Sequence, residues 1–303
     1  MVLFLKNYWY VAATSEELKN RPIGRILLNK RVVLFRGENG VVGALDDRCA
    51  HRLTPLSLGK IDGNLLECGY HGWSFNHTGK CLRLPGVDSP QNISIRSYPT
   101  IEKWGWVFIW MGNPDEANVC NLPDFHVMGE EKWVGDGSML RVEAHCNLIR
   151  DNLLDLTHAK YVHQQTLATE DVDKVPVKAE RKGDMVRVKR VMKNINPSPF
   201  FTRSVGYTDK IIHRQTTEFT PGCNIIIRLR GNSSPDTSEN LKNGFRVINA
   251  MTPETGTSTH YFWWLGRDYD QNNSSLTQWM KDANARTFLE DKTILEAQQK
   301  NIT

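Results

Sequence analysis

The sequences CAHR at residues 49–52 and CGYHGW at residues 68–73 decide how the first part of this chain folds. The first has the spacing Cys-x-His and the second Cys-x-x-His, with sixteen residues between His51 and Cys68. Each stretch therefore offers one thiolate and one imidazole, and both groups are common metal ligands. The residues around the two stretches predict short β-strands, so the loops would share one site on a β scaffold.

Two kinds of metal site use two cysteines and two histidines. Structural zinc sites of this composition usually pair Cys with Cys and His with His. A Rieske [2Fe–2S] cluster instead places both cysteines on one iron and both histidines on the other. Each loop must then reach both irons, and the alternation of Cys and His within each stretch favours this arrangement. We therefore predict a cluster held by Cys49, His51, Cys68 and His71, with zinc as the minor alternative.

The chain is predicted to be α+β with two domains. Residues 1–114 form an all-β domain of short strands, including a hairpin at 31–47 that turns through Asn39 and Gly40. Residues 115–303 form a second, α+β domain with a helix at about 147–162 and a central antiparallel sheet. A long helix, capped by Ser274 or Ser275 and extending through Gln299, ends the chain.

Composition and charge exclude several classes of protein. Hydrophobic residues make up 40% and charged residues 24%, which is typical of a globular protein. We find no run of ~18 apolar residues and no basic segment typical of a signal peptide, so we expect a cytoplasmic protein outside the membrane. The net charge is only +4 and there is no long basic block, so we expect no nucleic-acid partner.

A second group of possible ligands lies in DNLLDLTHAKYVH at residues 151–163. On an ideal helix His158 and His163 would diverge by ~140°, so they converge only if the helix ends or bulges between them. Such a pair is usually ordinary polar surface. Here a redox cluster precedes it, and the cluster needs a destination for its electrons. Iron held by two histidines and one carboxylate leaves coordination positions open for O2 and substrate.

The C-terminal helix offers the carboxylate. On a helical wheel Asp291 lies within about 40° of the centre of the apolar stripe, and Glu290 lies near its edge. Asp282 and Glu296 face away from the stripe. A carboxylate among apolar residues is costly unless it is paired or bound to a metal. Asp291 is therefore the first candidate and Glu290 the second, whereas a buried salt bridge with Arg286 or Lys292 is the alternative.

At this point the residues match a known family over almost the whole chain. The chain resembles Rieske non-haem iron oxygenase α subunits, particularly the vanillate O-demethylase and dicamba monooxygenase branch. The matching segments are NYWYVAATSEEL at 7–18, CAHR and CGYHGWSF at 49–52 and 68–75, DNLLDLTHAKYVH at 151–163, and LEDKTILEAQQ at 289–299. Ala50 and Gly69 stand where proline is usual, and relatives usually continue a few dozen residues beyond Thr303.

The resemblance implies roles for individual residues. The cluster ligands would be Cys49, His51, Cys68 and His71, and the iron ligands His158, His163 and Asp291. Asp155 resembles the aspartate that connects an iron ligand to a cluster histidine of the neighbouring subunit. Asn152 resembles an asparagine close to the iron. Because the two centres of one chain lie too far apart for fast electron transfer, the resemblance also implies a homotrimer.

The resemblance further implies an oxidoreductase, the oxygenase component of a monooxygenase that hydroxylates or O-demethylates a small aromatic acid. Electrons would come from NAD(P)H through a reductase or ferredoxin. Alternatives are a ring-dihydroxylating or amine-demethylating oxygenase and, less favoured, a Rieske electron carrier without the second iron. Asn224 and Asn249 loosely match substrate-site positions, although each can equally be an ordinary polar strand residue. Arg228 and Arg230 could pair with a substrate carboxylate or face solvent.

Overall fold

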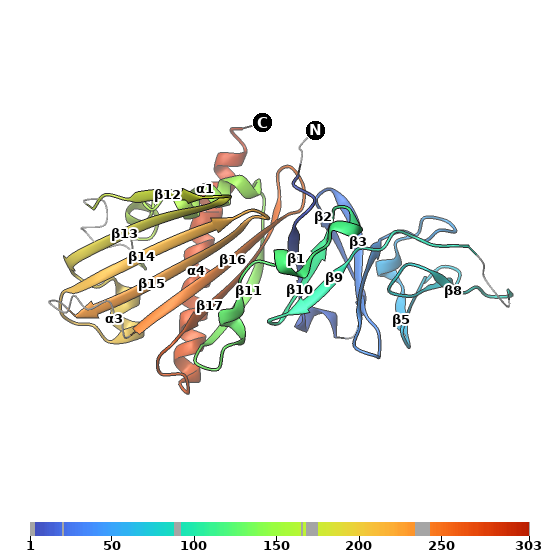
Figure 1. Ribbon diagram of the computed structural model, residues 1–303, viewed down its shortest axis with the longest axis horizontal. Coiled ribbons are helices and arrows are strands. Elements are labelled where there is room, and N and C mark those ends of the chain that lie inside the picture. Colours follow the sequence, from blue (N-terminus) through green and yellow to red (C-terminus); the bar gives the residue numbers. More distant parts are fainter. Residues whose placement is uncertain are drawn as a thin grey trace. The chain divides into compact units, whose positions relative to one another are not determined.

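The computed structural model describes residues 4–19, 21–87, 92–164, 166–167, 175–233 and 243–302 (Figure 1). The chain divides into two compact units. Unit 1 comprises Met1–Pro123 with Thr252–Gly256, and unit 2 comprises Asp124–Met251 with Thr257–Thr303. Within the described ranges, no helix has both the length and the apolar character needed to cross a bilayer.

Unit 1 is built from short strands in three small sheets with the orders β1-β10-β9, β2-β3-β4 and β5-β6-β7-β8. The expected hairpin is confirmed, since β3 and β4 pair antiparallel. The strands are β1 Trp9–Thr14, β2 Ile23–Leu27, β3 Lys30–Arg36, β4 Val42–Asp46, β5 Lys60–Asp62, β6 Leu65–Glu67, β7 Ser74–Phe75, β8 Cys81–Arg83, β9 Thr100–Lys103 and β10 Trp106–Trp110. The 3₁₀ turns among the described residues of this unit are η1 Glu16–Leu18, η2 Leu56–Leu58, η3 Pro114–Glu116 and η4 Val119–Asn121.

Unit 2 is dominated by a seven-stranded sheet in the order β11-β17-β16-β15-β14-β13-β12. The pairing of β11 with β17 and the successive pairings from β12 to β16 are antiparallel. The strands are β11 Val134–Val142, β12 Lys178–Lys182, β13 Met185–Ile195, β14 Ile211–Thr220, β15 Asn224–Ser233, β16 Asn243–Pro253 and β17 Thr259–Arg267. A 3₁₀ turn, η5 His126–Gly129, precedes them.

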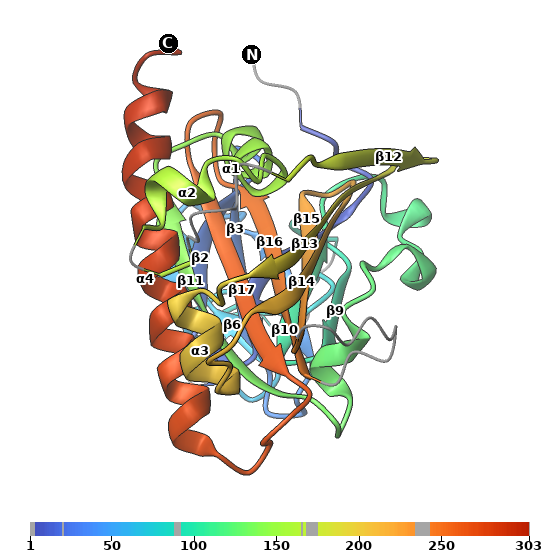
Figure 2. The same ribbon diagram turned by 90° about the vertical axis from the view of Figure 1, so that its left-hand side faces the viewer.

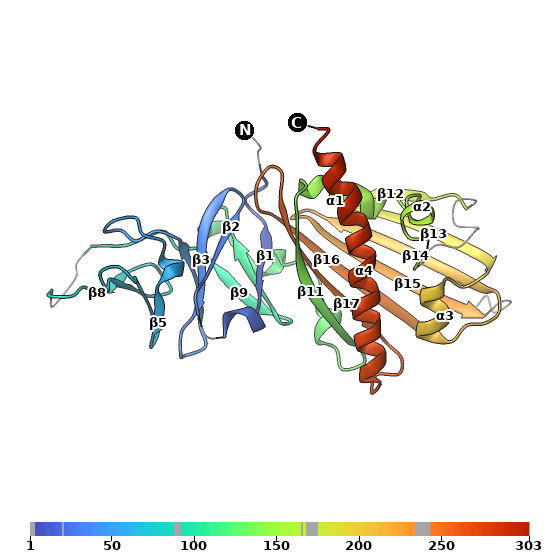
Figure 3. The ribbon, with the colours of Figure 1, turned by 180° about the vertical axis from the view of Figure 1, so that it is seen from behind.

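The helices of unit 2 are α1 Cys146–Leu154, α2 Ala159–Val162, α3 Pro199–Val205 and α4 Ser274–Gln299. Figures 2 and 3 show α2, α3 and α4 on the same face of the sheet, with α4 crossing its strands. Apolar residues of α1, α3, α4 and the strands form one core there. The expected fold class, an all-β domain followed by an α+β domain with a central antiparallel sheet and a long last helix, is confirmed.

Two local expectations were wrong. The predicted helix over 147–162 is interrupted: α1 ends at Leu154, and Asp155 takes the extended values φ −87° and ψ 95°. The cap of α4 is Asn273 rather than Ser274 or Ser275, because the Asn273 side chain accepts a hydrogen bond from the N–H of Leu276. The break after Leu154 leaves α2 as a separate short helix between His158 and His163.

Candidate active site

The two metal-binding loops of unit 1 follow β4 and β6. Cys49 and Cys68 are each only 2% exposed, and they pack with Leu56, Leu66 and Phe75 in the core beneath the loops. The rings of His51 and His71 are exposed, and their centroids lie 4.6 Å apart. The four predicted ligands are therefore arranged as a buried pair of neighbouring cysteines and an exposed pair of neighbouring histidines.

Both loops close with the same turn. The N–H of Leu53 donates to the carbonyl of Cys49 at 3.0 Å, and the N–H of Gly72 donates to the carbonyl of Cys68 at 3.1 Å. Both donor residues have positive φ, +60° for Leu53 and +71° for Gly72. A left-handed leucine costs roughly 1–2 kcal/mol, so the fold holds this loop in a conformation that local preference alone opposes.

Burial favours the neutral thiol of Cys49 in the absence of a metal. Burial is the main cause that raises the pKa of the Cys49 thiol to about 11, and hydrogen bonds from the backbone of His51 and Arg52 act in the opposite direction. Such a cysteine becomes a thiolate when a metal compensates for the lost solvation. Trp73 stacks on the ring of His51 with centroids 4.8 Å apart. These residues fit a [2Fe–2S] cluster with thiolate inside and imidazole outside.

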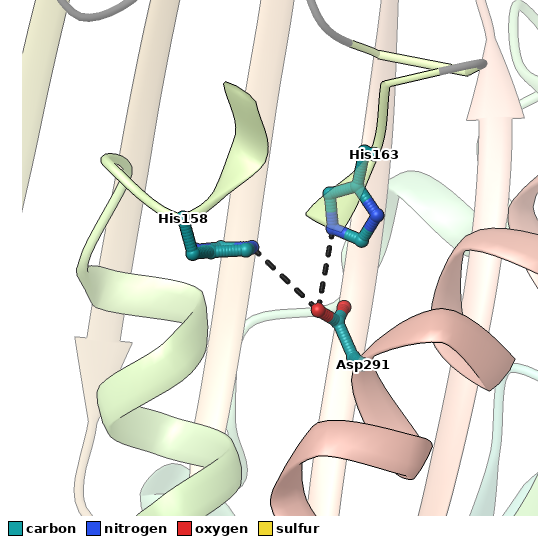
Figure 4. Close-up of side chains that lie close together, drawn as sticks. All are labelled: His158, His163 and Asp291. Carbon is teal, nitrogen blue, oxygen red and sulfur yellow. Dashed lines mark ion pairs between the residues drawn. The ribbon is translucent and has the colours of Figure 1, made fainter. Parts of the chain in front are cut away.

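In unit 2 the structure brings His158, His163 and Asp291 together (Figure 4). One ligand atom from each side chain lies within 4.8 Å of the others. Oδ1 of Asp291 is 3.7 Å from Nε2 of His158 and 3.3 Å from Nε2 of His163. His158 directly precedes the short helix α2 and His163 directly follows it, with non-helical values of φ −108° and ψ 40° at His163. The helix therefore ends at the second histidine, and the divergence expected on a continuous helix does not arise.

Three neighbouring groups orient these side chains. Nδ1 of His158 is 2.5 Å from the carbonyl oxygen of Asp155, and Nδ1 of His163 is 2.7 Å from Oε2 of Glu290. Nδ2 of Asn152 donates to Oδ1 of Asp291 at 3.1 Å. Occupation of Nδ1 in both rings leaves both Nε2 atoms available for a metal, which is how partners behind metal-ligating histidines act.

The charges around His163 also favour a cation at this place. Burial is the largest influence and lowers the pKa of His163, but Asp291 and Glu290 outweigh it and hold the pKa above its ordinary value. The two carboxylates therefore create a negative environment around a buried imidazole. Two neutral imidazoles and one carboxylate are a suitable donor set for non-haem iron, so the residues fit the group that the sequence predicts.

Asp155 lies at the surface where α1 ends. Its Oδ1 accepts hydrogen bonds from the N–H of Thr157 at 3.0 Å and from its hydroxyl at 2.6 Å. These bonds and the charge of His158 lower the pKa of Asp155, with the hydroxyl of Thr157 as the largest cause. The carboxylate is therefore ionised and accessible in the single chain.

A cavity lies beside the triad, and its walls are mostly apolar. Polar residues that sequence reasoning did not select also line it, namely Arg190, Ser198, His213, Gln215, Asn284 and Thr287. The apolar lining residues are Leu153, Leu156, Ala159, Leu167, Met192, Phe200, Phe201, Ile227, Leu229, Phe245, Val247, Leu265 and Phe288. An apolar cavity with a few polar groups beside a ligand triad is the usual form of a small-molecule site.

The other predicted substrate residues lie elsewhere. Asn224 and Asn249 are buried, but neither is among the residues that line the cavity. Asn249 accepts a hydrogen bond from the hydroxyl of Tyr261 at 2.7 Å, and Asn224 donates to the carbonyl of Pro221 at 3.3 Å. Arg228 and Arg230 form ion pairs with Glu218 and Asp268 respectively.

Comparison with known proteins covers both units. Residues 8–99 match the Rieske [2Fe-2S] domain family, and residues 142–303 match the family described as vanillate O-demethylase oxygenase C-terminal domain. The vanillate O-demethylase oxygenase subunit of Pseudomonas sp. (strain HR199 / DSM 7063) is 33% identical over 99% of this chain and 87% of that protein. The toluene-4-sulfonate monooxygenase iron-sulfur subunit of Comamonas testosteroni is 33% identical over 98% and 89%.

A solved structure is similar over nearly the whole chain. Dicamba monooxygenase bound to 3,6-dichlorosalicylic acid has a TM-score of 0.94 at 28% identity, covering 99% of this chain and 89% of that one. The similarity includes the loops that carry the cysteines and the helices that carry the triad, because both lie within the matched length.

Proposed function

The chain belongs to the vanillate O-demethylase oxygenase family of Rieske proteins, and we propose that it is a terminal oxygenase that oxidises a small aromatic acid with O2. The observation that carries this proposal is the triad of His158, His163 and Asp291, of which the last two are buried, beside a mostly apolar cavity. The same chain also contains paired Cys-His loops for a cluster. An electron carrier needs only the loops, so the triad and cavity favour an oxygenase.

The proposed metal groups have assigned residues. Cys49, His51, Cys68 and His71 would hold the cluster, and His158, His163 and Asp291 would hold the iron. When bound, the cluster supplies single electrons and the iron supplies the means to activate O2. The carbonyl of Asp155 holds Nδ1 of His158, and Glu290 holds Nδ1 of His163. Both rings are thereby oriented with Nε2 toward Asp291. The apolar walls bind the substrate and exclude water from the reacting carbon.

The substrate class comes from the named relatives. One is named for vanillate, one for toluene-4-sulfonate, and the similar structure holds a chlorinated salicylic acid. All three compounds are small aromatic acids, and phenyl rings suit a cavity that contains Phe200, Phe201 and Phe245. If the attacked carbon belongs to a methoxy group, hydroxylation gives a hemiacetal that collapses to a phenol and formaldehyde.

The proposed function requires an electron donor and brings an oligomeric assembly with it. A reductase, or a reductase with a ferredoxin, would supply electrons from NAD(P)H. We propose a homotrimer in the cytoplasm, in which the ionised and exposed Asp155 of one subunit accepts a hydrogen bond from a cluster histidine of the next. The exposed rings of His51 and His71 support this contact, since both are accessible in the single chain.

Product analysis tests the proposal. Protein containing about three iron atoms per chain, two for the cluster and one for the triad, receives a surrogate reductant, O2 and a panel of methoxylated and plain aromatic acids. Loss of CH2 with release of formaldehyde supports O-demethylation, and addition of one oxygen supports hydroxylation. A cis-diol or an N-dealkylated product would move the function to the alternative oxygenase classes. About two iron atoms per chain and no product would identify an electron carrier.

A further inference from the structure

One transverse row of the sheet in unit 2 points into the cavity. Across the antiparallel pairings, Arg190 of β13 lies opposite Gln215 of β14, Gln215 opposite Leu229 of β15, and Leu229 opposite Phe245 of β16. Directly paired residues project from the same face of a sheet. All four residues line the cavity beside the triad. The row therefore places a guanidinium and an amide in the same space as two apolar side chains.

Arg190 is buried, with only 3% of its surface exposed. It donates from NH1 to the carbonyl of Leu156 at 3.3 Å and from NH2 to Oε1 of Gln215 at 3.2 Å. These two acceptors are neutral, and Arg190 takes part in a further interaction besides them. Burial lowers the pKa of Arg190, because an apolar environment disfavours its charge. A ligand that places an anionic oxygen against this guanidinium would offset that cost and make charge-assisted hydrogen bonds.

Two further polar groups line the same cavity. His213 of β14 lies two residues before Gln215, on the same face of the sheet, and opposite Met192. Its pKa is lowered to about 3 by burial first and by Arg190 second, so the ring is neutral near pH 7. Nε2 of His213 and Nδ2 of Asn284 have no hydrogen-bond partner in the described part of the chain. Buried polar atoms of this kind are normally paired in the functional state of a protein.

Arg228 of β15 does not lie in the row of residues that faces the cavity. Arg228 lies opposite Thr216 and Arg246, in the row next to that of Arg190 and Leu229. Successive residues of a strand alternate between faces, so Arg228 projects from the face opposite the cavity. There it pairs with Glu218. Arg228 is consequently a matched control for Arg190, with the same charge in the same sheet.

We propose that Arg190, together with Gln215 and His213, forms a subsite that binds the carboxylate or sulfonate group of the aromatic substrate. The acidic group would lie against β13 and β14, while the ring lies among the phenylalanines and presents its other substituents to the triad. This inference rests on the proposed function, since it assigns the recognition of an acid in that same cavity. It accounts for a buried cation in the wall of a mostly apolar site.

Calorimetric titration of the metal-loaded protein, without reductant so that no turnover occurs, tests the subsite. The probes are 4-methoxybenzoate, 4-methoxybenzenesulfonate and the neutral 4-methoxybenzamide. We expect Arg190→Met to weaken binding of the acids roughly 10- to 100-fold and binding of the amide less than about threefold. Arg190→Lys keeps the charge and should recover part of the loss, whereas Arg228→Met should bind all three probes as the native protein does. The two acids together show whether carboxylate, sulfonate or both are accepted.

Several results would overturn the subsite. One is equal binding of acid and amide by the native protein. Another is an equal loss of both in Arg190→Met, which would indicate that Arg190 only supports the backbone at Leu156. Loss of acid binding in Arg228→Met alone would place the anion on the other face. Should Arg190→Met fail to fold, Arg190→Lys and Gln215→Leu are judged by the same ratio of acid to amide affinity. Acid binding that depends on Arg190 without any oxidised product would retain the subsite and reject the proposed function.

Discussion

Nδ1 of His163 lies 2.7 Å from Oε2 of Glu290, the residue that directly precedes Asp291 in α4. Asp291 approaches the same ring from the other side, with Oδ1 3.3 Å from Nε2. Two successive carboxylates of one helix therefore contact both nitrogens of one imidazole. The two contacts orient the ring so that Nδ1 keeps its proton against Glu290 when a metal occupies Nε2.

Glu290→Ala should weaken iron binding at the triad roughly 10- to 100-fold, because removal of a hydrogen-bond partner behind a ligating histidine has effects of this size. Glu290→Gln should lose less, since its amide oxygen can still accept from Nδ1. Iron retention is measured by metal analysis after dialysis against graded chelator. Asp282→Asn, an exposed change on the same helix, is the control. Retention equal to that of the native protein in Glu290→Ala would show that Glu290 does not position His163.

Asp155→Asn should leave both metal centres occupied but slow the delivery of electrons to the catalytic unit. Asparagine retains an oxygen for the bonds from Thr157, so the turn before His158 is preserved. What it loses is the negative charge that would hold a histidine of the neighbouring subunit. The rate of product formation in a single turnover, with cluster and iron pre-reduced or only the cluster reduced, measures the step. Asp151→Asn, also exposed and four residues earlier, is the control, and a normal rate in Asp155→Asn would reject the bridging role.

Much of the fold could be predicted from local patterns. The turn at residues 37–40 and the alternating segments of the second unit correspond to observed hairpins and strands. The break of the helix after Leu154 could not be predicted in this way, because residues 147–162 contain no proline or glycine that would end a helix. At the interruption, Thr157 donates two local hydrogen bonds to the Asp155 carboxylate, and Arg190 donates a tertiary bond to the carbonyl of Leu156.

The site shows the same division. The apolar stripe of α4 identified Asp291 as a buried carboxylate, and the structure places it at 5% exposure beside both histidines. The role of Glu290, the residue directly before Asp291, could not be predicted in this way. Its contact with Nδ1 of His163 depends on the orientation of a ring that lies 127 residues away in sequence. Arg190 did carry a sequence signal, since it alternates in phase with Val188 and Met192 on the buried face of β13. The informative pattern was a charged residue on the apolar face of a strand. An arginine elsewhere on a strand does not by itself indicate a binding site.

Removal of the iron should lower the melting temperature of the catalytic unit without loss of the visible absorption of the cluster. The metal binds the folded triad and not the unfolded chain, so at a free concentration of about 100 times Kd it stabilises by roughly 2.7 kcal/mol. Scanning calorimetry of chelated and Fe(II)-restored protein measures this. His163→Ala should be insensitive to added Fe(II). A native protein whose transition ignores both chelator and Fe(II) would show that the triad binds no metal.

The buried His213 should make the protein less stable in mild acid. Burial first and Arg190 second lower its pKa from 6.5 to about 3, so in the folded protein the ring stays neutral while in the unfolded chain it takes up a proton below pH 6.5. The unfolded state then binds more protons, and the free energy of unfolding falls by up to about 1.4 kcal/mol per pH unit as the pH decreases below 6.5. Above that pH the ring is neutral in both states and contributes no slope. His213→Gln keeps a polar side chain that does not titrate, so relative to the native protein it should gain roughly 2 kcal/mol between pH 7 and pH 5. Guanidinium unfolding of ligand-free protein at pH 5, 6, 7 and 8 gives both curves. Parallel curves would show that His213 titrates with its ordinary pKa, and a native protein that gains stability relative to His213→Gln as the pH falls would show that the ring is charged in the folded state.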